Sequence, residues 1–160
     1  MNRMACEPTF RNYIDRNSEN VLDPLTEPAI IGEIGRAWRE SQPDDPANRH
    51  EEGGYILLNP DLSYEIARWP RGGQSRIAPP PPDARNCYNG KVVSATFHTH
   101  PNPPVDEAGL EWEQGPSESD RRWHMRRKLR GFVIGRLLIY EIDVNAAIHV
   151  LGKREEVLGL

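Results

Sequence analysis

Two histidines separated by one residue, His98 and His100, are the residues whose spacing points most directly to chemistry. They follow the β-branched run 91–97, which predicts a strand, and residues two apart in a strand point to the same face. Both imidazoles can therefore reach one metal ion. Catalytic zinc takes three protein ligands and leaves a fourth position for water, so this pair needs a third ligand from elsewhere in the chain.

The third ligand is predicted from the segment 117–120, which reads Ser-Glu-Ser-Asp. Serine is preferred at the N-cap of a helix, so Ser117 would place Asp120 in the first turn, where the helix dipole favours an ionised carboxylate. Asp106 is the alternative, because it lies closer to the histidines in sequence, but no serine stands three residues before it. The sequence favours Asp120 and predicts a zinc site with two imidazoles and one carboxylate.

In combination these motifs resemble the signature of the JAB/MPN/Mov34 (JAMM) zinc metalloproteases, in particular their prokaryotic JAB-like branch. That signature is an upstream glutamate, then His-x-His-Pro, then Ser-x-x-Asp, and the chain has His-Thr-His-Pro at 98–101 before the Ser-Glu-Ser-Asp segment. The family's Glu-x-x-Gly before an apolar strand is matched by Glu-Glu-Gly-Gly at 51–54. The resemblance covers residues 28–143. Compact family members have a shorter gap before the aspartate, so residues 101–116 are interpreted as a loop insertion.

The resemblance implies a role for each matched residue. The implied zinc ligands are His98, His100 and Asp120. Glu51 would accept a proton from a zinc-activated water and return it to the leaving amine, and Ser117 would hydrogen-bond the oxyanion. Glu52 is the rival base, because successive strand residues face opposite sides and only one of the two can face the metal. The family spacing to Gly54 selects Glu51.

The resemblance also implies a fold and a substrate. The fold would be JAB/MPN-like (cytidine-deaminase-like), an α+β arrangement with a mixed, mostly antiparallel sheet flanked by helices. The activity would be hydrolysis of a peptide or isopeptide bond, to process or deconjugate a ubiquitin-like protein whose tail lies along a sheet edge. The insertion at 101–116 would line or cover that channel. Two alternatives are a toxin or effector protease domain of the same fold and a non-catalytic MPN-like scaffold, although such scaffolds usually lack the metal ligands found here.

The pattern along the chain also predicts an α+β domain. Apolar residues recur at helical spacing over 28–40, with Thr26 as the possible cap. A second helix is predicted over 118–130, ended by Gly131. Alternating or continuous apolar runs predict strands at 54–58, 64–69, 91–98, 132–143 and 146–151.

The remaining histidines and the cysteines are predicted to take no part in metal binding or catalysis. His50 is interpreted as a loop residue, His124 as a helix-surface or supporting residue, and His149 as structural. Cys6 and Cys87 could form one bridge, but two free thiols in a reducing cytoplasm are the favoured expectation. No sequence pattern around Cys87 indicates a nucleophile.

Length and charge limit the remaining possibilities. The 160 residues suit one domain, predicted as an N-terminal extension over 1–25 and a metalloprotease domain over 26–160. A net charge of −4 does not fit a nucleic-acid binder, and no apolar stretch is long enough to span a membrane. The resemblance implies that the partner is a protein substrate, and the predicted location is the cytoplasm, with secretion as an effector left open. The oligomeric state is also left open.

Overall fold

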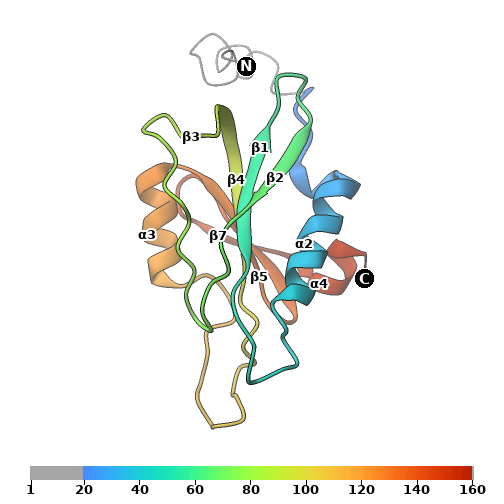
Figure 1. Cartoon of the computed structure of the whole chain (residues 1–160), viewed down its shortest axis with the longest axis vertical. Coiled ribbons are helices and arrows are strands. Elements are labelled where there is room, and N and C mark those ends of the chain that lie inside the picture. The colour runs from blue at the N-terminus through green and yellow to red at the C-terminus, as the bar shows by residue number, and fades with distance from the viewer. Residues whose placement is uncertain (1–19, 160) are drawn as a thin grey trace.

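A seven-stranded sheet forms the centre of the computed structural model, which describes residues 20–159 (Figure 1). The strand order is β2-β1-β4-β5-β6-β7, and β3 pairs with β4 outside this path. The strands are β1 (Gly53–Leu58), β2 (Tyr64–Arg68), β3 (Cys87–Tyr88), β4 (Lys91–Thr99), β5 (Arg130–Ile134), β6 (Leu138–Ile142) and β7 (Ile148–Lys153). The helices are η3 (Pro24–Thr26), α2 (Pro28–Glu40), α3 (Glu118–Arg127) and α4 (Arg154–Leu158).

The sheet is mixed but mostly antiparallel. Strands β4 and β5 run parallel, and helix α3 lies in the crossover connection that such a pair needs; every other named pair is antiparallel. The α+β class and the predominantly antiparallel sheet expected from the sequence are therefore confirmed. The strands predicted at 54–58 and 64–69 correspond to β1 and β2, which pair as an antiparallel hairpin.

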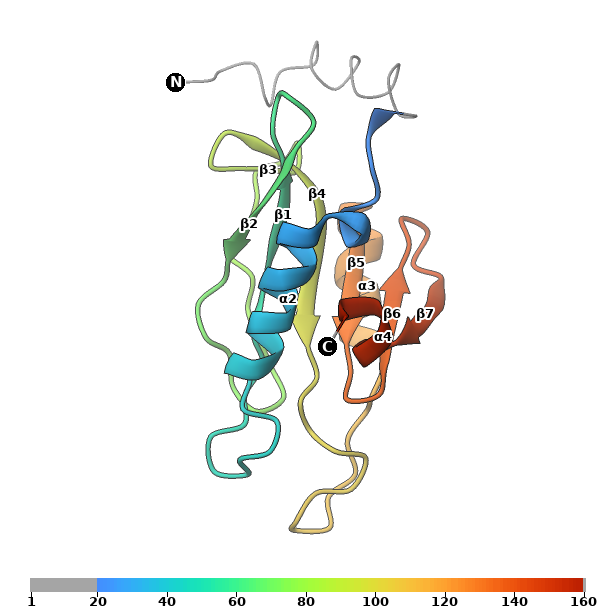
Figure 2. The same cartoon turned by 90° about the vertical axis from the view of Figure 1, so that its right-hand side faces the viewer.

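Helix α2 covers one face of the sheet together with α4 (Figure 2). Its residues Ile30, Ile34, Ala37 and Trp38 are buried, as the helical spacing predicts, and they pack in one cluster with residues of β1, β4, β5 and β6. The predicted cap is wrong: Glu27 occupies the N-cap position without a side-chain capping bond. The fixed φ of a proline at the first helical position helps to start this helix instead.

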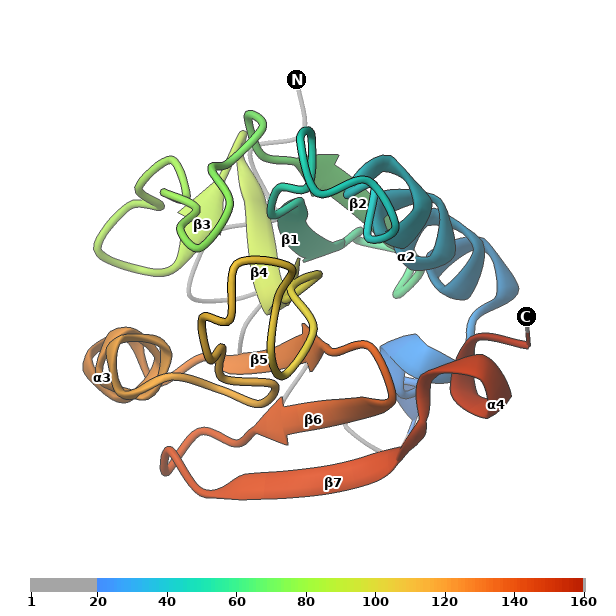
Figure 3. The ribbon, with the colours of Figure 1, turned by 90° about the horizontal axis from the view of Figure 1, so that it is seen from below.

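Helix α3 lies on the opposite side of the sheet from α2 and α4 (Figure 3). It ends at Lys128, which adopts a left-handed conformation with φ 53°, and not at Gly131 as predicted. Gly131 belongs to β5, where a Cβ atom would lie 2.2 Å from Cε1 of His124. This glycine therefore makes room for a buried histidine and does not end the helix.

Three further predictions concern the N-terminal extension, the cysteines and membrane-spanning helices. Residues 1–19 of the predicted extension and Cys6 lie outside the described residues, whereas Pro24 is buried and Leu25 packs against the core. Cys87 is disulfide-bonded, so the expectation of a free thiol is wrong there, and the cysteines no longer support a reducing compartment. Across residues 20–159, no helix combines the length and apolar character needed to cross a membrane.

Candidate metal centre

The pairing of β1 with β4 sets the position of the candidate base. Gly53 lies opposite His98 in this antiparallel pair, and the amide of Thr99 donates to the carbonyl oxygen of Glu52 at 2.8 Å. Two residues further along each strand, this register brings Glu51 beside His100. Oε1 of Glu51 lies 3.7 Å from Nε2 of His100. This close pairing of β1 with β4 requires a residue without a side chain at Gly53, because a Cβ atom there would lie 2.7 Å from the carbonyl oxygen of Phe97.

His98 and His100 stand at the end of β4 with their rings turned toward each other. Their Nε2 atoms are 3.1 Å apart and their ring centroids 4.9 Å apart. His98 is buried, with 5% of its surface exposed, and His100 is largely buried. The strand thus holds the Nε2 atoms of both histidines close enough together to bind one metal ion, as the sequence predicts.

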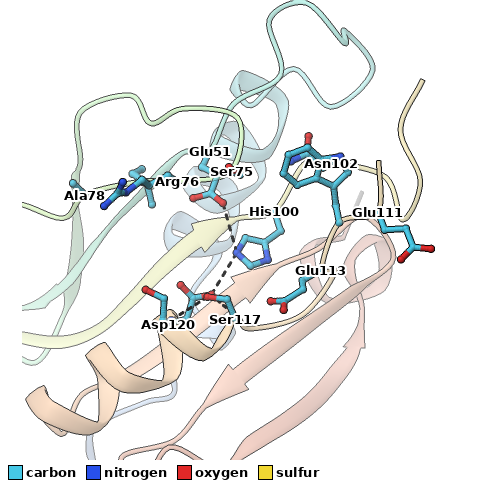
Figure 4. A pocket seen from close by; sticks show the side chains of 13 residues that line it. Glu51, Ser75, Arg76, Ala78, His100, Asn102, Glu111, Glu113, Ser117 and Asp120 are labelled. Carbon is cyan, nitrogen blue, oxygen red and sulfur yellow. Dashed lines mark hydrogen bonds and ion pairs between the residues drawn. The ribbon is translucent and has the colours of Figure 1, made fainter. Parts of the chain in front are cut away.

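The first turn of α3 supplies the carboxylate. Ser117 is the N-cap residue, and it forms a reciprocal capping box with Asp120: Ser117 Oγ accepts from the Asp120 amide at 3.0 Å, and the Ser117 amide donates to Asp120 Oδ2 at 2.8 Å. Asp120 Oδ1 lies 3.4 Å from His98 Nε2, and Oδ2 lies 3.5 Å from His100 Nε2. The capping bonds therefore hold this carboxylate against both imidazoles, and Figure 4 shows it beside the ring of His100.

These three residues, here called the metal group, fit the demands of a metal ion. Each offers one ligand atom, and these atoms lie within 4.8 Å of one another. Ligand atoms ~2.0–2.1 Å from a tetrahedral zinc ion lie roughly 3.3 Å from each other. The two Nε2 atoms are 3.1 Å apart, and Asp120 approaches them with different oxygens, Oδ1 at 3.4 Å from His98 and Oδ2 at 3.5 Å from His100; each of these separations is close to that value. The metal group can therefore hold a metal ion with little movement of its side chains.

Burial and charge act differently on the two carboxylates of the site. Burial raises the pKa of Glu51 to about 7, although His100 opposes the shift. Burial also acts to raise the pKa of Asp120, but His98 and His100 outweigh it and hold that pKa well below its usual range. Asp120 is thus ionised and ready to bind a cation, whereas Glu51 can take up and release a proton near neutral pH.

Glu52, the rival base, faces away from the metal group. Its Oε1 atom lies 3.0 Å from Nη2 of Arg68, a guanidinium that also binds Glu33 and Glu40 of α2. The structure therefore places Glu51 at the site and Glu52 in an ion-pair network beneath α2. This separation agrees with the alternation of side chains expected for the start of a strand.

Asp106, the alternative ligand, forms its hydrogen bonds within the insertion loop. Its Oδ2 atom accepts from the indole Nε1 of Trp112 at 2.9 Å, and its Oδ1 atom accepts from the amides of Ala108 and Leu110. These three contacts hold the insertion loop, residues 101–116, in a closed turn. Asp106 is not part of the metal group.

The other histidines lie outside the metal group, as expected, but the helix-surface alternative for His124 is wrong because its side chain is buried. His124 is buried, its Nδ1 atom pairs with the carbonyl oxygen of Leu129 at 2.8 Å, and burial lowers its pKa to about 4. His50 is buried against the carbonyl oxygen of Asn48, and His149 forms an ion pair with Asp143 at 2.8 Å on the surface. Each has a structural partner of its own.

A cavity of about 470 Å³ opens beside the metal group. Glu51, His100, Ser117 and Asp120 all line it, so the candidate base and the capping serine face the same space as two of the ligands. Figure 4 shows these side chains converging from β4, from the segment before β1 and from the start of α3. A substrate in this cavity would contact the metal and Glu51 together.

Two residues that support the site were not identified from the sequence. Thr99, between the two ligands, turns its Oγ1 atom to the other face, where it lies 2.6 Å from Ser41 Oγ and accepts from the Glu52 amide at 2.9 Å. Asn102 is buried and links the insertion loop to Gln74. Strand alternation predicts the direction of Thr99, but nothing local to the sequence reveals either partner.

Comparison with known proteins identifies no relative of this chain. No protein-family model matches the chain, and the searches of curated proteins and of solved structures find no match either. The case for a function therefore depends on the geometry of the site and on the resemblance of its motifs.

Proposed function

We propose that the protein is a zinc-dependent hydrolase of the JAB/MPN type, which cleaves a peptide or isopeptide bond in a ubiquitin-like protein or its conjugate. One observation carries the proposal: two imidazoles and a carboxylate converge beside an open cavity that His100 and Asp120 line, with a second, protonatable carboxylate facing the same cavity. A purely structural zinc site would normally be closed by a fourth protein ligand.

The donor set supports zinc as the metal. Two imidazole nitrogens and one carboxylate oxygen form a common catalytic zinc set, and they leave one position for water. When bound, zinc would lower the pKa of that water to about 7 and supply a nucleophile at neutral pH. No thiolate belongs to the metal group, which leaves the site less suited to soft metals such as Cu(I).

The residues around the metal group have the chemistry that hydrolysis requires. Glu51, buried and with a pKa of about 7, can accept the proton of the attacking water and return it to the leaving amine. The Oγ atom of Ser117 accepts a hydrogen bond from the Asp120 amide. The hydroxyl hydrogen of Ser117 can therefore be donated to the oxyanion that forms at the scissile carbonyl. The resemblance of the motifs to the JAMM signature assigns the same roles to both residues.

The arrangement of the fold is compatible with this proposal. The histidines end a central strand, the carboxylate opens the helix that connects it to its parallel neighbour, and the candidate base precedes the adjacent antiparallel strand. Each ligand therefore comes from an element fixed by the sheet, which is what a preorganised metal site needs.

The proposal is tested by turnover. Wild-type protein and the Glu51→Gln variant, both loaded with zinc, would be incubated with a peptide library and with peptides joined through a lysine ε-amine, and products identified by mass spectrometry. We expect the wild-type protein to cleave, a chelator to abolish cleavage, and added zinc to restore it. Glu51→Gln should keep its zinc and lose turnover. Equal cleavage by both proteins, or cleavage that survives chelation, would rule the proposal out.

A further inference from the structure

The cavity beside the metal group has two walls that carry opposite charges. One wall is the segment 75–78, which contributes Arg76, and the other is the insertion loop, which contributes Glu111, Trp112 and Glu113. Figure 4 shows Arg76 on one side of His100 and the two glutamates on the other side. The metal group therefore lies between a basic wall and an acidic wall.

The two glutamates have no structural partner that would explain their charge. The other acidic residues of the insertion loop are used within the fold: Asp106 binds Trp112, and Glu107 pairs with Nη2 of the buried Arg49 at 3.1 Å. Glu111 and Glu113, by contrast, form no ion pair and no side-chain hydrogen bond with any residue in 20–159. Their charges remain available to a molecule in the cavity.

Arg76 is equally free on the opposite wall. Its carbonyl oxygen accepts from the amide of Gly73 at 2.7 Å, which fixes the backbone, but its guanidinium makes no ion pair or hydrogen bond within the described part of the chain. Other arginines close to the site are engaged: Arg68 with three glutamates, and Arg49 with Glu107. Arg76 therefore differs from its neighbours in facing the cavity with an uncompensated charge.

The two walls are connected by partly buried hydrogen bonds. Asn102, 5% exposed, donates to the carbonyl oxygen of Gln74 at 2.9 Å and accepts from the Gln74 amide group at 3.3 Å. Gln114 donates to the carbonyl oxygen of Asn102 at 3.0 Å and to that of Trp112 at 3.2 Å. These bonds connect the base of the insertion loop to the segment that leads into Arg76, so the cleft is built in advance of any ligand.

The charge of the metal does not cancel this polarity. A zinc ion carries two positive charges, which the carboxylates of Glu51 and Asp120 balance at the floor of the cavity. What remains is the pair of glutamates on one wall and the arginine on the other. Opposite charges on facing walls orient an extended ligand whose own charges match them.

We infer that this cleft selects peptides with a basic side chain on one side of the scissile bond and an acidic side chain on the other. Glu111 and Glu113 would bind the basic side chain, and Arg76 the acidic one, with the bond to be cleaved lying over the metal group. This inference rests on the proposed function and names its substrate class. It makes these three residues determinants of specificity and gives them no part in the bond cleavage itself.

The test measures binding separately from turnover. Zinc-loaded Glu51→Gln protein, which should not cleave, would be titrated with labelled peptides that contain Lys and Glu on opposite sides of an Ala-Ala centre and lack His and Cys. Both orders of the two charges would be used. We expect one order to bind best, and replacement of its Lys by Gln to weaken binding roughly tenfold, because two exposed charge pairs are each worth up to about 1 kcal/mol.

Protein variants show whether the walls are responsible. In the background of Glu111→Gln with Glu113→Gln, the penalty for replacing the peptide Lys should disappear, and Arg76→Ala should remove the penalty for replacing the peptide Glu. Matched controls are Glu155→Gln with Glu156→Gln on α4 and Arg39→Ala on α2, which change the net charge equally away from the cavity. These controls should keep both penalties.

Two results would overturn the inference. One is equal affinity for charged and uncharged peptides, and the other is a penalty that persists in the wall variants. Either result is independent of the hydrolase proposal, which is decided by whether the zinc-loaded wild-type protein cleaves, and by the chelator and Glu51→Gln comparisons described above.

Discussion

Oε1 of Glu51 lies 3.7 Å from Nε2 of His100, and this contact joins the candidate base to the metal group. It depends on a pairing of two strands that are more than 30 residues apart in the chain, since Gly53 must lie opposite His98. The strand pairing buries Glu51, and this burial raises its pKa to about 7 although the contact with His100 opposes the rise. It also predicts how the site should respond to pH and to substitution.

Zinc binding should release a proton from Glu51. In the metal-free protein burial raises the pKa of Glu51 from 4.5 to about 7, so at pH 6 the carboxyl group is mostly protonated. The charge of a bound zinc ion favours the carboxylate, so binding displaces that proton and zinc affinity rises as the pH increases toward 7. Calorimetric titration in buffers of different ionisation enthalpy counts the protons. Glu51→Gln should release fewer protons than the wild-type protein at pH 6, and an equal number would contradict the assignment.

Thr99 should position Glu51 without touching the substrate. Thr99→Val removes the contact with Ser41 and leaves the buried Glu52 amide without its acceptor, which costs about 1–3 kcal/mol of folding stability. The displaced segment should lower kcat/KM roughly a hundredfold, because small errors of position are costly in catalysis. Zinc should remain bound. Thr99→Ser keeps the hydroxyl and should restore most of the activity; loss of activity in both variants alike would argue against a positioning role.

Gly131 should tolerate no side chain. A Cβ atom there would lie 2.2 Å from Cε1 of His124 and 2.8 Å from Oγ1 of Thr96, so Gly131→Ala should destabilise the protein by roughly 1–3 kcal/mol in urea unfolding. Adding His124→Ala should recover part of this loss, because the clash is with that ring. Gly32→Ala on α2 is the control: nothing lies within 4 Å of its Cβ position, and it should stabilise the helix by ~0.5–1 kcal/mol. A Gly131→Ala protein as stable as the wild type would refute this packing.

His124 should make the fold sensitive to acid. Burial lowers its pKa to about 4 from the ordinary 6.5, so the folded state binds fewer protons than the unfolded state between these values. The resulting stability, up to about 3 kcal/mol, is fully present above pH 6.5 and is lost as the pH falls through 4. His124→Gln should flatten this part of the pH dependence in urea unfolding.

The sequence predicted those parts of the site that depend on local geometry. The alternation of a strand puts His98 and His100 on one face, and a capping serine puts Asp120 in the first turn of a helix, so these predictions needed no tertiary information. The helix over 28–40 was likewise visible from its apolar spacing. The whole metal group therefore follows from local geometry together with one motif resemblance.

What the sequence could not predict depends on contacts between distant segments. The hydrogen bond between Ser41 and Thr99 spans 58 residues, and the role of Gly131 is defined only by the ring of His124 that packs on it. Helix α4 has only five residues and no capping bond, so its formation depends on burying Leu158 against the core. The disulfide of Cys87 is a tertiary contact of the same kind.

The central claim, that His98, His100 and Asp120 hold one zinc ion, is tested most directly by elemental analysis of the purified protein. We expect one zinc per chain in the wild-type protein, none in His100→Ala or Asp120→Ala, and full zinc in Asp106→Ala, because Asp106 is bound to Trp112 in the insertion loop. Circular dichroism would establish that each variant is folded. A folded Asp120→Ala protein that keeps its zinc would contradict the account.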